Sequence, residues 1–230
     1  MRLRAISVVL VATLVSGCGA DRAERIPDSD VNDHGSYTVD DVLAAVATCR
    51  QVSSGMYATD GETAPSVSIC GLDGAVFWQA DMDIDCDGKL TEACNERTDP
   101  AYQNETSLRT STGDWLDAAT LPYVVVPLPS PRFDYQQAGI RLGAVAAVIY
   151  DRQLRFGIFG DEGPDDIIGE ASYRMAKELG INPDPANGGT DTGVTYIVFV
   201  GADAVVDPVE SNPETVRRGD QLMEQLLQNR

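Results

Sequence analysis

The chain has 230 residues, and its 36 acidic residues outnumber its 17 basic ones, which gives a formal net charge of −19. A chain this acidic repels nucleic acids, so we exclude a nucleic-acid partner, and its field concentrates cationic ligands near any acidic cleft. Acidic residues also increase solubility in proteins that bind no such ligand. The placement of the acids therefore has to decide between the two interpretations.

The first 17 residues are predicted to be a lipoprotein signal peptide. Arg2 and Arg4 form a short basic region, residues 6–14 are apolar but too few to span a membrane, and Val15-Ser16-Gly17-Cys18 is similar to a bacterial lipobox. Cys18 would become the lipidated first residue of an envelope protein. The alternative is an ordinary secretory signal, and both interpretations export the protein. Cleavage would leave 15 basic residues against 36 acidic ones, a formal charge of −21.

A polar tether is predicted over residues 18–36, followed by one domain over residues 37–230, long enough for a single sizeable core. The only histidine, His34, lies in the tether. This position excludes Ser-His-Asp and Cys-His mechanisms. We expect a monomer without a cofactor.

Four further cysteines would fold in an oxidising compartment if the protein is exported. Proximity in the chain favours two disulfides, Cys86 with Cys94 and Cys49 with Cys70. Zinc is the alternative, but the sequence has no paired C-x-x-C spacing and no histidine in the domain. We therefore expect disulfides.

The domain begins with an amphipathic helix, predicted over residues 38–51 by capping and acidic residues followed by apolar residues at helical spacing. Runs rich in Val, Ile, Phe and Tyr then predict strands. These runs are residues 75–80, 123–127, 142–150, 154–159 and 194–200. Asp151-Arg152 separates two of the runs and predicts a hairpin.

Helices are predicted again over residues 169–179, with Glu170 in the first turn and Gly180 as the stop, and over residues 213–229. Gly219 weakens the second of these, which we interpret as a packing helix. Several short strands and few helices predict a mainly β domain, a small barrel with helices on its outside.

Two carboxylates are candidates for catalysis. Asp161 follows a strand that ends in glycines, which permit close approach of a ligand, and Glu170 opens the helix predicted nine residues later, where the helix dipole favours its charged form. Hydrolysis of a glycosidic bond needs one carboxylic acid to protonate the leaving oxygen and one carboxylate to activate water or attack the sugar. Each residue alone is more often a turn or helix-start residue.

An aspartate ladder, D-M-D-I-D-C-D-G from Asp81 to Gly88, has three interpretations. Asp83, Asp85 and Asp87 match the first half of an EF-hand calcium loop, but the twelfth position is Cys94 instead of Glu. The other interpretations are a substrate groove and an acidic turn without a ligand. Aspartates that alternate on a strand point to one face, so we favour substrate contact, with calcium second.

The candidate substrate-binding residues are Asp81, Asp83, Asp85, Asp87, Tyr102, Gln103 and Glu162. Asp165 and Asp166 would extend the acidic rim, and Trp78 and Tyr123 would offer stacking surfaces, although such aromatics more often lie in the core.

Six stretches occur in order between about residues 75 and 199: D-M-D-I-D-C-D-G, Y-Q-N-E-T-S, L-D-A-A-T-L-P-Y-V-V-V-P, Y-D-R-Q-L-R-F-G-I-F-G-D-E-G-P, I-G-E-A-S and G-V-T-Y-I-V-F. Together they resemble the chitosanases of glycoside hydrolase family 75, known best from fungi. The resemblance implies internal cleavage of chitosan with inversion, with Asp161 and Glu170 as the catalytic pair. It also implies a compact six-stranded β-barrel of double-psi type.

The sequence therefore predicts an exported endo-acting chitosanase, in which we favour Glu170 as general acid and Asp161 as the base for water. Chitosan carries ammonium groups at mildly acidic pH, which suits the charge of the chain. The alternative is a non-catalytic envelope lipoprotein that binds a glycan, with or without calcium.

Overall fold

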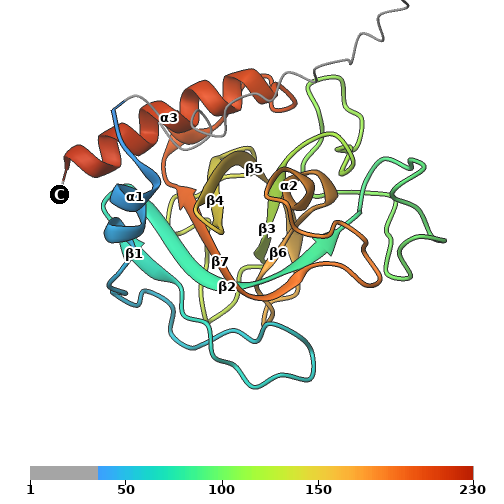
Figure 1. Ribbon diagram of the computed structural model, residues 1–230, viewed down its shortest axis with the longest axis horizontal. Helices are drawn as coiled ribbons and strands as arrows, with labels where there is room; N and C mark the ends of the chain where they lie inside the picture. Colours follow the sequence, from blue (N-terminus) through green and yellow to red (C-terminus); the bar gives the residue numbers. More distant parts are fainter. Residues whose placement is uncertain (1–35, 230) are drawn as a thin grey trace, which may run out of the picture.

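The structure is a computed structural model, and it describes residues 36–229 (Figure 1). The predicted signal peptide, Cys18, His34 and nearly all of the tether lie outside the described residues. Within residues 36–229, no helix combines the length and the apolar content that crossing a membrane requires.

The fold consists mainly of strands, with three α-helices among the described residues. In chain order, the elements are α1 (Val39–Ala45), β1 (Cys70–Leu72), β2 (Ala75–Asp85), β3 (Tyr123–Pro127), β4 (Val145–Tyr150), β5 (Gln153–Gly163), β6 (Glu170–Ser172), α2 (Tyr173–Glu178), β7 (Thr190–Phe199), a 3-10 turn (Ala202–Ala204) and α3 (Asn212–Gln228).

The strands form a closed barrel. Along the sheet the order is β2, β6, β3, β5, β4 and β7, and β7 returns to pair with β2, while β1 pairs with β2 from outside this ring (Figure 1). The pairs β2–β6 and β3–β5 are parallel, and the remaining pairs are antiparallel. A six-stranded, mainly β barrel with peripheral helices is therefore confirmed.

The long C-terminal helix α3 packs against the barrel with one face. Met223 and Leu226 are buried on it, in the same hydrophobic cluster as Phe156 of β5. Gly219 lies against the same ring: a Cβ built there would come 2.3 Å from a Phe156 ring carbon. The glycine that weakens the helix in isolation is therefore required for its close packing.

Several local predictions are confirmed. Strand β3 has the predicted bounds, and Asp151 and Arg152 join β4 to β5 with φ of 46° and 61°, which the tight hairpin requires. The two predicted disulfides, Cys49–Cys70 and Cys86–Cys94, are both present. The first helix is shorter than predicted, since α1 ends at Ala45.

The prediction of a helix over residues 169–179 is wrong at its start. Residues 170–172 form β6, which pairs with β2 on one side and β3 on the other, and α2 follows with Ser172 as its N-cap. The Ser172 hydroxyl also accepts from the backbone N–H of Tyr123 and so ties this junction to β3. Tertiary pairing overrides the local helical signal. Glu170 consequently lies on a strand, and the helix-dipole argument for its charged form does not apply.

Candidate active site

Carboxylates from three strands project from one face of the sheet. Asp83 of β2 is in register with Glu170 of β6, and since alternate residues share a face, Asp85 lies on the same side. Asp161 of β5 is in register with Val125 of β3, which belongs to this face as well. The sheet order β2, β6, β3, β5 therefore gathers acids that are up to 87 positions apart in the chain, from Asp83 to Glu170.

A bulge in β5 brings Asp161 to this face. The register between β3 and β5 shifts between Val124 and Val125, so that Gly160 is the extra residue and Asp161 is turned to the opposite side of the sheet from Phe159. A Cβ at Gly160 would come 2.7 Å from the Tyr123 Cβ. Only glycine fits there, which gives a physical reason for the glycine that precedes the aspartate.

The acids line a cavity of about 680 Å³, a volume typical of ligand sites. Its walls also include Val125 and Leu128 on β3 and the following loop, and Pro185 and Ala186 on the loop before β7. No Lys or Arg of the described residues lines it. The acids that line it are Asp83, Asp85, Asp87, Asp99, Asp161, Glu162 and Glu170.

Asp161 is buried and firmly held. Its Oδ1 accepts hydrogen bonds from the backbone N–H and the hydroxyl of Ser107, both at 2.8 Å, and from the backbone N–H of Glu162 at 2.8 Å. Burial raises the pKa of Asp161 above its usual value, and these donors oppose the rise because they stabilise the carboxylate. The arrangement holds the Asp161 carboxylate in one orientation.

At Glu170, burial and the neighbouring charges all oppose ionisation of the carboxyl group. Burial first, and then the negative charges of Asp83, Asp87 and Asp161, raise its pKa to about 8. Neutral carboxylic acid is consequently the main form of Glu170 at neutral pH. Two carboxyl groups whose surroundings separate their proton affinities are typical of an acid and base pair.

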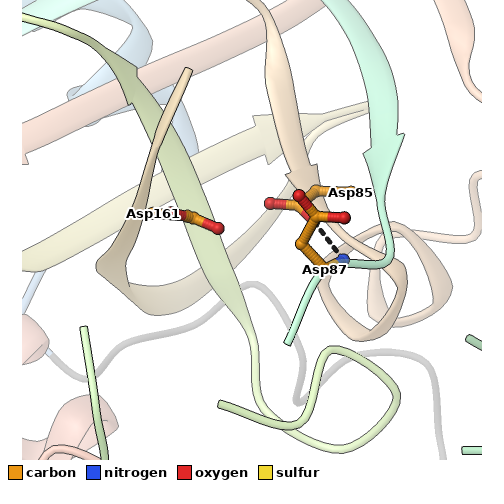
Figure 2. A group of neighbouring side chains, drawn as sticks. All are labelled: Asp85, Asp87 and Asp161. Carbon is orange, nitrogen blue, oxygen red and sulfur yellow. Dashed lines mark hydrogen bonds between the residues drawn. The ribbon is translucent and has the colours of Figure 1, made fainter. Parts of the chain in front are cut away.

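Asp85, Asp87 and Asp161 bring their carboxylates together in the cavity. One carboxylate oxygen from each lies within 4.8 Å of the others, and Figure 2 shows the Asp161 carboxylate pointing toward the other two. Oxygen ligands of this kind suit a hard cation such as Ca²⁺. The predicted calcium set of Asp83, Asp85 and Asp87 is thus not the group that converges, because Asp161 takes the place of Asp83.

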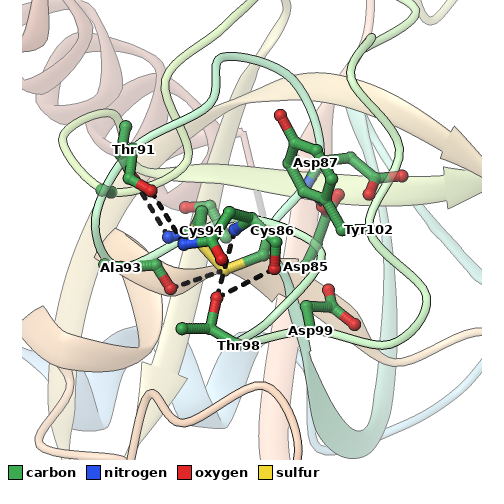
Figure 3. The surroundings of a disulfide bond; sticks show 12 residues. Asp85, Cys86, Asp87, Thr91, Ala93, Cys94, Thr98, Asp99 and Tyr102 are labelled. Atoms are coloured by element: carbon green, nitrogen blue, oxygen red, sulfur yellow. Dashed lines mark hydrogen bonds between the residues drawn. A yellow bond between two sulfur atoms is a disulfide. The ribbon is translucent and has the colours of Figure 1, made fainter.

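The Cys86–Cys94 disulfide fixes the end of the aspartate ladder (Figure 3). Cys86 stands between Asp85 and Asp87, and the backbone N–H of Asp87 donates to Asp85 Oδ1 at 2.6 Å. The Asp87 carboxylate in turn accepts from the backbone N–H of Gln103 at 2.6 Å. The disulfide and these two hydrogen bonds therefore hold the acidic turn in place.

Of the remaining predicted site residues, Gln103 and Glu162 line the cavity and Asp81 and Tyr102 do not. Asp81 is buried beside a bulge between Ala80 and Met82, and its Oδ1 has no hydrogen-bond partner among the described residues. The Tyr102 hydroxyl donates to the Gly88 carbonyl.

The two aromatic residues considered for stacking are core residues. Trp78 is 1% exposed and stacks on Tyr196, and Tyr123 is fully buried, with its hydroxyl donating to the Asp87 carbonyl. Asp165 and Asp166 are exposed but do not line the cavity. These residues cannot contact a substrate in the cavity.

Sequence reasoning missed three residues of the site: Asp99, which lines the cavity, Ser107, which holds Asp161, and Trp115, which lies in an adjoining hollow. Trp115 has a signal of its own in the sequence. A tryptophan in the polar turn S-T-G-D-W is unusual unless it packs against the protein or binds a ligand. Ser107 ends the stretch Y-Q-N-E-T-S, but its hydrogen bond to Asp161 follows only from the fold, and Asp99 stands in none of the six stretches.

Comparison with known proteins shows which family this chain resembles. The family model described as fungal chitosanase of glycosyl hydrolase group 75 matches residues 82–226. Endo-chitosanase B of Aspergillus oryzae is 35% identical over 162 residues, 63% of this chain and 67% of that protein. An endo-chitosanase of Aspergillus fumigatus is 34% identical over 172 residues, 68% of this chain and 72% of that protein. The match to endo-chitosanase C of Aspergillus oryzae spans only 38% of its length.

Proposed function

The chain belongs to the family of fungal chitosanases of glycosyl hydrolase group 75, and from this premise we propose that it hydrolyses chitosan at internal β-1,4 bonds between glucosamine units. The observation that carries the proposal is the pairing of Glu170 and Asp161 on one face of an acid-lined cavity. A polymer of ammonium-bearing sugars complements such a cavity in charge.

In the proposed mechanism, Glu170 is the general acid. Its pKa of about 8 keeps the proton available at the mildly acidic pH where chitosan is charged, and that proton passes to the leaving glycosidic oxygen. Asp161, held as a carboxylate by Ser107 and the Glu162 amide, accepts a proton from water, which attacks the anomeric carbon from the opposite face. This route inverts the configuration of the sugar.

Substrate binding is assigned to the other acids of the cavity. Asp83, Asp85, Asp87 and Glu162 would accept hydrogen bonds from ammonium and hydroxyl groups of the sugars, and Gln103 would offer its amide. Asp81 and Tyr102 have no part in this proposal, because neither lines the cavity.

The first test measures the release of reducing ends from highly deacetylated chitosan by the purified protein. We expect oligosaccharides from the wild type and a loss of at least about 10²-fold in turnover from Glu170→Gln and from Asp161→Asn, in the range of general acid or base contributions. An active double variant would contradict the catalytic assignment. Folded wild-type protein that releases nothing would favour the alternative, a glycan-binding protein without catalysis.

We further propose that the protein is exported. The two disulfides support this because such bonds persist in oxidising compartments. Attachment of lipid at Cys18 and a monomeric state are part of the same proposal. The mass of the mature N-terminal peptide tests the lipid, and light scattering tests the monomer.

A further inference from the structure

A second hollow adjoins the cavity at Asp161. This hollow of about 390 Å³ shares Asp87, Gln103, Asp161 and Glu162 with the first. Glu170 lines only the first one. Asp161 therefore lines both of two adjoining hollows, and the proposed acid Glu170 lines one of them.

Trp115 lines the second hollow, together with Arg109 of the same loop. The two residues face each other across a short turn, and the Arg109 guanidinium lies over the indole, 3.2 Å from the ring centroid. The guanidinium also donates to the Gly113 carbonyl at 2.7 Å. Arg109 thus holds the indole in one orientation, and the indole borders the hollow beside it.

The loop that carries Trp115 is also bonded to the catalytic strand. Ser107 donates twice to the Asp161 carboxylate, and the backbone N–H of Leu108 donates to the Gly160 carbonyl at 3.1 Å. The Thr106 hydroxyl accepts from the backbone N–H of Leu116, next to the tryptophan. These contacts hold the indole at a set position relative to Asp161.

From this geometry we propose that Trp115 is the stacking platform of a subsite for a glucosamine unit of chitosan, in the hollow that Asp161 lines and Glu170 does not. The inference rests on the proposed function, because an endo-acting enzyme has to hold sugars on both sides of the bond it cleaves. The apolar face of the sugar ring packs on the indole. Glu105, a carboxylate in the same hollow, accepts hydrogen bonds from the ammonium group.

The chain offers a direct reporter for this subsite. It has two tryptophans, and the other one, Trp78, is 1% exposed in the core. A change in tryptophan emission or in acrylamide quenching when a sugar binds therefore reports on Trp115. We expect the hexamer of glucosamine, titrated into the full-length Glu170→Gln variant, to shift the emission saturably and to protect the fluorophore from acrylamide.

Variants test the same subsite through kinetics and calorimetry. Trp115→Ala is expected to raise KM for chitosan and Kd for the hexamer about tenfold, which corresponds to about 1.4 kcal/mol, with a smaller effect on kcat. Trp115→Phe, which keeps an aromatic surface, is expected to restore most of the affinity. Tyr150→Ala serves as the matched control, because Tyr150 is a partly exposed aromatic residue that lines neither hollow.

The outcomes separate the subsite from the function itself. If the wild type cleaves chitosan and binds the hexamer while the emission and quenching of Trp115 stay unchanged, the subsite is refuted and the chitosanase function stands. The subsite is also refuted, and the function stands, if the Trp115→Ala and Tyr150→Ala variants bind the hexamer equally well. A folded wild type that neither cleaves chitosan nor binds the hexamer overturns both.

Discussion

At the scale of single residues, the proton affinity of Glu170 depends on its neighbour across the strand pair. Asp83 is in register with Glu170, and its negative charge is the largest cause of the raised pKa of Glu170 after burial. A nearby like charge disfavours the ionised form of a carboxyl group. Asp83 therefore helps to keep the proposed general acid protonated.

The variant Asp83→Asn tests this dependence. Removing the charge lowers the pKa of Glu170, so the alkaline limb of the kcat profile, which we expect near pH 8 in the wild type, moves to lower pH. Turnover of chitosan oligomers at saturating concentration, measured from pH 4 to about pH 9, gives the limb. Asp73→Asn is the matched control, because Asp73 lies in the turn before β2, at the opposite end of the strand. An unmoved limb in Asp83→Asn would show that another group sets it.

The sequence singled out Asp161 and Glu170, which line one cavity in the structure, but it did not single out Ser107 or Trp115. Asp161 and Glu170 stand in motifs with glycines and strand residues around them, and the resemblance assigned both. Ser107 and Trp115 lie in a loop whose position against β5 depends on the closed barrel. A hydrogen bond between residues more than 50 positions apart leaves no local pattern in the chain.

At the scale of elements, the bulge at Gly160 links packing to catalysis. An alanine there would place its Cβ 2.7 Å from the Tyr123 Cβ and 2.8 Å from Leu116 Cδ1, and both neighbours are fully buried. The strand would have to shift, and Asp161 is the next residue along it. The position of the Asp161 carboxylate, the proposed base, therefore depends on the lack of a side chain at Gly160.

We expect Gly160→Ala to lower the free energy of unfolding by about 1–3 kcal/mol, as overpacking does, and to lower turnover more than the loss of stability explains. Urea unfolding measures the change in stability. Chitosan hydrolysis, assayed well below the midpoint of unfolding, measures the change in turnover. Gly61→Ala is the control, since Gly61 has open space around it and needs no unusual backbone angle. Wild-type turnover in a folded Gly160→Ala protein would contradict the role of the bulge.

Strand ends were the weakest part of the fold prediction, for a related reason. Aspartate is rare in strands, yet β2 continues from its predicted end at residue 80 to Asp85, and β5 continues from its predicted end at residue 159 to Gly163. Of the acids in these extensions, Asp83, Asp85, Asp161 and Glu162 line the cavity, whereas Asp81 does not. Functional sites are where such local rules fail, so the errors in the element boundaries fall on the site itself.

At the scale of the whole molecule, gathering so many acids affects stability. Burial raises the pKa of Asp81 and Glu170 to about 8 and that of Asp83 and Asp87 to about 6, whereas the unfolded chain ionises near pH 4. Between about pH 4 and pH 8 the folded protein therefore holds more protons than the unfolded chain. The free energy of unfolding falls as pH rises through this window, since the state with more bound protons is favoured by acid.

Asp81 allows this prediction to be tested outside the cavity. It is buried, lines neither hollow and leaves Oδ1 without a hydrogen-bond partner among the described residues, so Asp81→Asn removes an ionisation while keeping the shape of the side chain. We expect the thermal midpoint of the wild type to be higher at pH 5 than at pH 8, and Asp81→Asn to reduce the difference. Each kcal/mol corresponds to about 2–4 °C in a domain of this size. Asp73→Asn makes the same chemical change at an exposed turn and should leave the difference as it is. If the two variants behave alike, the pH dependence comes from net charge and not from the buried acids.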